Sequence, residues 1–70
     1  MSTAEKVGKN LAVARKTKGM TQAQVAHVLH KYQSDYSEYE TGKIELDYEK
    51  IVKLCDLFEI TPNDLFGIGD

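Results

Sequence analysis

Hydrophobic residues recur along most of this chain at the three- and four-residue spacing of one face of an α-helix. Val7, Leu11 and Ala14 mark such a face in a first helix, expected from residue 3 or 4 to residue 18. Gly19 follows and supplies a left-handed stop. No segment alternates apolar and polar positions as a half-buried strand would, so the chain is predicted to be all-α.

A second helix is expected from Thr21 to about residue 29. Thr21 and Gln24 have the form of a capping box, in which each side chain accepts a hydrogen bond from the backbone N–H of the other. The inward-facing residues of this helix are expected to be Val25, Ala26 and Leu29, with Val28 beside them.

Residues 30–32 form a short connection to a third helix, expected from residue 33 to residue 40 or 41. Tyr36 and Tyr39 are its expected inward anchors, and Gly42 ends it. A connection of three or four residues is the length found in a helix-turn-helix, whose second helix enters the DNA major groove. The segment from about residue 21 to residue 41 is therefore the candidate site.

The last third of the chain predicts two more helices. Asp47 is an acceptable N-cap for a fourth helix over about residues 48–59. The expected apolar stripe of this helix is Tyr48, Ile51, Val52, Leu54, Cys55 and Phe58. Thr61, Pro62 and Asp64 combine an N-cap, a proline at the first helical position and an acid at the third, which predicts a short fifth helix ending near Phe66. Residues 67–70 are expected to be a frayed tail.

The size of the chain argues against catalysis. Its 70 residues make one domain, which buries only about 60% of its unfolded surface. Five short helices can barely enclose the pocket of roughly 300–1,000 Å³ that a small-molecule site needs. The sequence has no Cys or His cluster with metal spacing, no glycine-rich phosphate loop and no Ser–His–Asp arrangement, so no enzyme activity, metal or cofactor is expected.

Composition also bears on the compartment. No apolar run approaches the ~18 residues that a membrane span needs, and residues 1–10 lack the apolar core of a signal peptide. The single Cys55 fits a reducing cytosol and lies on the expected core stripe, where a small buried apolar residue is its simplest role. A cytoplasmic protein is expected.

The net charge of −2 conceals an asymmetry. Residues 1–34 carry six basic residues against Glu5, a balance of +5, whereas residues 35–70 carry three lysines against ten acids, a balance of −7. The basic half could face a polyanion, or both halves could be ordinary solvated surfaces. Charge alone leaves this choice open.

The two central helices offer groups suited to DNA. Thr21 and Gln22 present a donor and the positive end of a helix dipole to a phosphate. Gln33 and Ser34 would place polar side chains at base edges, since Gln pairs with adenine and Ser bonds either type of edge. Lys43, just past the third helix, would meet the next phosphate. Each feature alone is more often an ordinary solvated side chain, so the joint spacing carries the prediction.

At this point the sequence resembles a known family. The residues at the family's spacing are Val7-Gly8, Leu11, Ala14-Arg15, Gly19 to Gln22, Val25-Ala26, Leu29, Gln33-Ser34, Ser37, Tyr39 to Gly42 and the segment from Leu54 to Asp64. With them the chain resembles the lambda-repressor-like helix-turn-helix domains, the Xre or phage repressor and Cro class, over about residues 7–66. The segment HKYQSDYSEYETGKIELD is also similar to a subgroup whose pattern reads roughly GKPQSFVSKYERGERRLD.

The resemblance implies a five-helix bundle, usually a DNA-binding homodimer that regulates transcription, of prokaryotic or phage origin. It also implies a pair between Arg15 and Glu40 across the first and third helices, which would fix the recognition helix. The alternative is that Arg15 only joins the basic surface. By family habit and exposed apolar content, the fifth helix and residues 66–68 are the expected dimer contact.

Several residues depart from the family pattern. His30 stands where the family usually has glycine, and it could be pH-sensitive or simply solvated. Tyr32 could stack on the sugar-phosphate backbone or cover the turn. Asp35, Glu38 and Glu45 bring carboxylates where phosphates would repel them, although a carboxylate can also accept from cytosine N4.

Two functions remain open on this evidence. The first is a dimeric, sequence-specific regulator on double-stranded DNA. Its expected base contacts are Gln33, Ser34, Asp35, Ser37 and Glu38, and its expected phosphate contacts are Thr21, Gln22, Lys31, Tyr32 and Lys43. The second is a protein-interaction module on the same fold, antitoxin-like or titrating another regulator, with Tyr36 and Ile44 as contacts if they are exposed.

Overall fold

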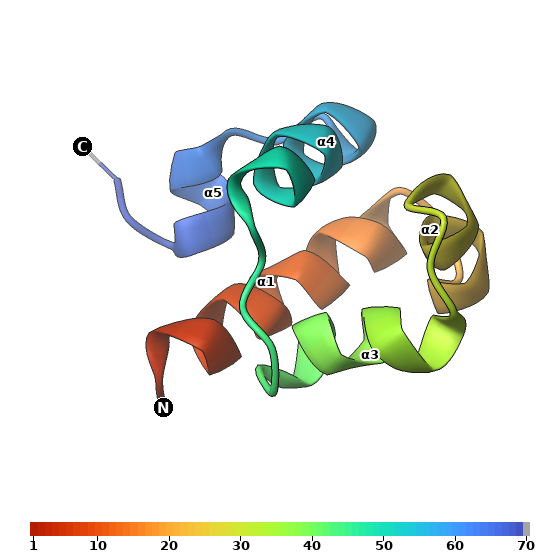
Figure 1. The fold of residues 1–70 in the computed structure, drawn as a ribbon. Helices are drawn as coiled ribbons and strands as arrows, with labels where there is room; N and C mark the ends of the chain where they lie inside the picture. The colour runs from red at the N-terminus through yellow and green to blue at the C-terminus, as the bar shows by residue number, and fades with distance from the viewer. Residues whose placement is uncertain (70) are drawn as a thin grey trace.

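Residues 1–69 are described by a computed structural model, in which they form five α-helices (Figure 1). Helix α1 (Thr3–Thr17) begins with a capping box that the sequence analysis did not identify. The Ser2 hydroxyl accepts from the Glu5 N–H at 3.1 Å, and the Glu5 carboxylate accepts from the Ser2 N–H at 2.9 Å. Gly19 follows the end of α1 with a φ of 75°, the left-handed stop that was predicted.

Helices α2 (Gln22–Val28) and α3 (Gln33–Thr41) lie within a residue of their predicted limits. The Thr21–Gln24 capping box is present, and Gly42 ends α3 in the left-handed conformation with a φ of 79°. His30, in the connection between the helices, also has a positive φ of 56°. A residue with a β-carbon adopts this conformation at a cost, so the turn itself demands it.

Helices α4 (Tyr48–Phe58) and α5 (Pro62–Phe66) complete the chain. The Asp47 side chain caps α4 by accepting from the Lys50 N–H at 2.8 Å. Helix α4 ends one residue earlier than predicted, because Glu59 takes a left-handed conformation with a φ of 57°. The Thr61–Asp64 capping box opens α5 as the sequence indicates.

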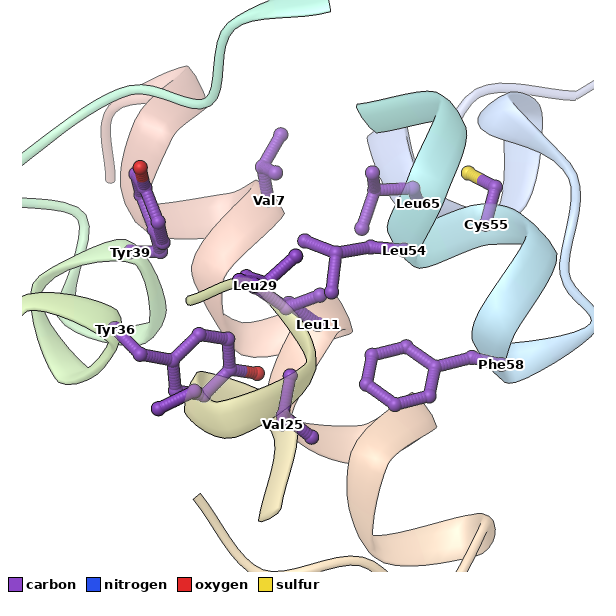
Figure 2. Packing of buried hydrophobic residues seen from close by; sticks show 11 residues of the cluster. Val7, Leu11, Val25, Leu29, Tyr36, Tyr39, Leu54, Cys55, Phe58 and Leu65 are labelled. Atoms are coloured by element: carbon purple, nitrogen blue, oxygen red, sulfur yellow. The ribbon is translucent and has the colours of Figure 1, made fainter. Parts of the chain in front are cut away.

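Helix α1 runs through the middle of the molecule. Helix α3 packs against α1 and α2, whereas α5 packs against α1 and α4. In Figure 1, α3 and α4 lie on opposite sides of α1. The buried core draws on all five helices (Figure 2) and consists of Val7, Leu11, Val25, Ala26, Leu29, Tyr36, Tyr39, Leu54, Cys55, Phe58 and Leu65. Neither strand nor candidate membrane-spanning helix occurs in residues 1–69.

The predicted apolar stripe of α4 is wrong at two positions. The exposed fractions of Tyr48 and Val52 are 88% and 68%, whereas Leu54, Cys55 and Phe58 are buried. Because successive helical residues are about 100° apart, Tyr48 and Val52 share one row at the edge of the stripe. The neighbouring helices cover the buried side of α4 and leave this row uncovered. The protein thus exposes two large apolar side chains that the sequence pattern assigned to the core.

Helix α3 approaches α1 closely at Gly8. A β-carbon at this position would lie 2.4 Å from the carbonyl oxygen of Glu40 and 2.6 Å from that of Tyr39. Only glycine therefore lets the backbones of the two helices meet here. This contact fixes the distance of the second half of α3 from the body of the domain.

Candidate nucleic-acid interface

A buried ion pair holds α3 against α1. The Arg15 guanidinium donates from Nε to Glu40 Oε2 at 2.7 Å and from Nη2 to Glu40 Oε1 at 3.1 Å. The exposed fractions of the two side chains are only 11% and 6%. Arg15 also donates from Nη1 to the carbonyl oxygen of Met20 at 2.9 Å, which ties down the loop before α2. A fork of this kind sets the orientation of both helices, not only their separation.

The Glu40 carboxylate has two further donors that the sequence analysis missed. The hydroxyl of Tyr36, which is fully buried, donates to Oε2 at 2.6 Å, and Gln22 Nε2 donates to Oε1 at 2.9 Å. Burial raises the pKa of Glu40, but the hydrogen bonds from Arg15, Tyr36 and Gln22 outweigh it and hold the pKa below its ordinary value of 4.5. Glu40 thus joins α1, α2 and α3 as a charged acceptor. The four-residue spacing of Tyr36 and Glu40 on one helix could have indicated the first of these contacts; no local pattern indicates the Gln22 contact.

The hydrogen-bond chain continues to the start of α3. Gln33 Nε2 donates to Gln22 Oε1 at 3.4 Å, a long contact between the first residues of the two helices. Because Gln22 Nε2 is turned toward Glu40, to which it donates, Gln22 Oε1 is the atom that faces Gln33. Within residues 1–69 no donor is bound to the oxygen of the exposed Gln33 amide, which can therefore accept from an outside group.

The remaining expected base contacts lie on α3 at different depths. Ser34 and Asp35 are exposed beside Gln33, whereas Ser37 and Glu38 are half-buried. The structure therefore gathers Gln33, Ser34 and Asp35 on the accessible first turn of α3. Ser37 and Glu38 follow one turn later with less exposed surface.

Some of the expected phosphate contacts are exposed side chains, whereas others already contact groups within the protein. Tyr32 is 81% exposed, and Lys43 is also exposed just past the end of α3. The Thr21 hydroxyl accepts in its capping box but keeps a hydrogen to donate, whereas Gln22 is engaged with Glu40. Lys31 is half-buried, and its Nζ lies 5.7 Å from the centroid of the Tyr39 ring, a cation–π contact.

The arrangement of α2 and α3 agrees with a comparison to known families. The chain matches the family model of the helix-turn-helix domain over residues 8–67. It belongs to this lambda-repressor-like helix-turn-helix family. Searches among curated proteins and among solved structures each found no match. Membership of a helix-turn-helix family implies DNA binding, and members are typically not enzymes.

In the helix-turn-helix frame, α3 is the recognition helix and α2 the helix that crosses the backbone. A cleft of about 440 Å³ flanks the turn between them and is lined by His27, His30, Lys31, Tyr32 and Asp35. It brings three of the expected contact residues together with His27 and His30, to which the sequence analysis assigned no DNA contact. No group of three or more His, Cys, Asp or Glu residues within positions 1–69 could hold a metal ion.

Two expected protein contacts differ in exposure. Tyr36 is fully buried, which confirms its expected place as an inward anchor of α3, so the exposure that a protein contact would require is not met. Its hydroxyl turns inward to Glu40, and burial followed by the neighbouring carboxylate raises its pKa. Ile44, in the loop after α3, is 47% exposed and remains accessible.

Proposed function

We propose that this protein is a sequence-specific transcriptional regulator that reads a pseudo-palindromic operator as a homodimer through α3. The observation that carries the proposal is the Glu40 network, which fixes the recognition helix to α1 and α2 through buried, charge-assisted hydrogen bonds. Rigid presentation of a few polar side chains suits base recognition, because each contact requires defined hydrogen-bond geometry.

Base contacts are assigned to the first two turns of α3. Gln33 offers a free amide oxygen, which suits the exocyclic amine of adenine or cytosine in the major groove. Ser34 and Ser37 can bond either type of base edge, and Asp35 or Glu38 can accept from cytosine N4. This set favours operator positions that present amine donors over those that present only acceptors.

Phosphate contacts are assigned around α3. Thr21 caps the start of α2, and Lys43 follows the C-terminal end of α3. Tyr32, whose side chain is exposed, lies in the turn between α2 and α3. With few cations and two acids on this face, few counterions are released on binding, so the affinity should depend only modestly on salt. Specificity would then come mostly from base contacts and from the paired half-sites of a dimer.

The proposal is tested by fluorescence anisotropy with DNA fragments from around the protein's own gene. We expect specific binding whose log Kd rises with log salt concentration, and a loss of about 1–3 kcal/mol on Gln33→Ala that depends on the base pair read. The matched control is Asn63→Ala, which removes an exposed amide from α5. If the wild type and Gln33→Ala each bind DNA fragments of different sequence with equal affinity, the proposal is refuted.

Asp35 on the exposed turn of α3 favours a second candidate function, a protein-interaction module with weak DNA binding. A basic partner would pair with Asp35, whereas phosphates would repel it. The two candidates differ in their response to Asp35→Asn. That change should lower the affinity for a basic protein partner, measured by pull-down, but raise the affinity for non-specific DNA, measured by anisotropy on the same preparation.

A further inference from the structure

The uncovered row of α4 forms an apolar surface away from the recognition helix. Tyr48 and Val52 lie one turn apart, with exposed fractions of 88% and 68%. Together with Glu49 and Lys53 they line an open groove of about 330 Å³. Exposed apolar surface of this kind marks a contact site more often when charged residues border it, as they do here.

A second hollow adjoins the first. Its volume is about 220 Å³, Tyr48 forms one wall, and Leu46, Ile51 and Phe66 are among its apolar residues. The surface therefore carries a projecting aromatic side chain directly beside an apolar recess. A surface with both a knob and a hole can be complementary to itself, which is what a twofold interface requires.

We propose that a second copy of this chain docks on this surface, with the two α4 helices antiparallel across a twofold axis. In such a contact, residue i meets residue j and j meets i. Antiparallel pairing brings Glu49 of each copy toward Lys53 of the other, so the two charges that border the apolar row are matched twice. Parallel pairing would oppose like charges, which disfavours it.

The position of α4 allows both recognition helices to remain free. Helix α4 packs against α5, whereas α3 packs against α1 and α2, so a partner docked on α4 does not cover α3 (Figure 1). This surface overlaps the contact expected from the sequence, which was α5 with residues 66–68, only at Phe66 in the adjoining hollow. Ile68, in that segment, is 60% exposed and borders neither the α4 groove nor the adjoining hollow.

The available area sets the expected strength. Stable interfaces bury about 800 Å² on each partner, roughly a sixth of the 4673 Å² surface of this chain. One face of an 11-residue helix with its adjoining recess offers less than that. We therefore expect a reversible, weak dimer in the free protein, with a Kd in the micromolar range. Two half-sites on one DNA would strengthen it by raising the effective concentration.

The test is sedimentation equilibrium of the full chain without DNA, from about 5 to about 500 µM. We expect a monomer–dimer equilibrium in the wild type, a dimer Kd at least about tenfold weaker in Val52→Glu, and no change in the control Ile68→Ser. A wild type that stays monomeric at the highest concentration would overturn the inference, as would an Ile68→Ser effect equal to that of Val52→Glu.

Charge exchange tests the antiparallel orientation. Glu49→Lys and Lys53→Glu should each weaken the dimer, and the double variant should recover it because the exchanged charges again oppose one another. Failure of the double variant to recover while both single variants weaken the dimer would reject this orientation. Circular dichroism melting of each variant checks that these exposed changes leave the fold intact.

The inference gives the proposed regulator its dimer surface, but it can fail separately from that function. Wild type and Val52→Glu are compared on DNA with one half-site and with two. Loss of the advantage of two half-sites in Val52→Glu, with equal affinity for one, supports the inference. A dimer that Val52→Glu weakens but that binds no DNA specifically refutes the proposed function alone, and a dimer that binds DNA specifically but is unaffected by Val52→Glu refutes the inference alone.

Discussion

Replacing Glu40 with alanine removes the acceptor that joins three helices. In the wild type, Arg15 donates twice to this carboxylate, and Tyr36 and Gln22 donate once each. After Glu40→Ala, Arg15 keeps only its bond to the Met20 carbonyl, and the buried Tyr36 hydroxyl has no protein acceptor in its present position. The variant therefore leaves a buried cation without its partner.

The expected loss is large for a domain of this size. Breaking one side of a buried pair costs about 3–5 kcal/mol, and an unsatisfied hydroxyl adds about 1–3. Because the truncated side chain admits water to Arg15, we expect a loss of about 3 kcal/mol in the free energy of unfolding. A 70-residue domain has roughly 4–10 kcal/mol in total, so the melting temperature should fall by about 12–24 °C.

Thermal melting followed by circular dichroism measures this loss, with Glu38→Ala as the control. Glu38 also contributes a half-buried carboxylate to α3, but it forms no ion pair among residues 1–69. A melting temperature of Glu40→Ala within about 4 °C of the wild type would correspond to less than about 1 kcal/mol and would refute the reasoning. At temperatures where the variant is folded, DNA affinity should fall as well, because α3 loses its fixed orientation.

Two further outcomes are expected. Gly8→Ala should lower the free energy of unfolding by about 1–3 kcal/mol despite the better helix propensity of alanine, because its β-carbon meets the backbone of Tyr39 and Glu40. Urea unfolding measures this change beside the exposed control Lys9→Ala, and a gain in stability for Gly8→Ala would contradict the prediction. As pH falls below 4.5, the stability that depends on the lowered pKa of Glu40 should be lost. Urea unfolding from about pH 7 to pH 3 should therefore show a steeper decline in the wild type than in Glu40→Gln, and equal declines would contradict it.

The helix limits were predictable because their signals are local. Thr21, Asp47 and Thr61 each cap a helix by accepting from a backbone N–H three residues later. Gly19 and Gly42 end helices because each adopts the left-handed conformation at its own position. Such contacts form within one turn of chain, so sequence spacing alone indicates them.

Helix α4 shows where this reasoning stops. Its apolar residues cover a wider arc than the neighbouring helices can bury, and a sequence pattern does not say which edge of that arc stays outside. The buried side is that of Leu54, Cys55 and Phe58, and the uncovered edge is that of Tyr48 and Val52. The outcome depends on where α5 docks, which is a tertiary property.

The positions of the expected contact residues and, through the family resemblance, the Arg15–Glu40 pair were predicted, but the other hydrogen bonds of the site were not. The start of α3 was expected to present Gln33 and Ser34, and both lie there exposed. The chain of bonds from Glu40 through Gln22 to Gln33 depends on the crossing of α2 over α3, so residues 18 positions apart in sequence meet only in the fold. Sequence alone therefore did not indicate which face of the Gln33 amide is available.

The shared carboxylate of Glu40 also bears on how the protein opens. Helix α2 is short, and such an element commonly exchanges its amide hydrogens through local fluctuations. Here, separation of α2 from α3 breaks the Gln22 bond to the carboxylate that also binds Arg15. We therefore expect helices α1, α2 and α3 to open as one cooperative unit, so that the slowest amides of all three exchange only through global unfolding.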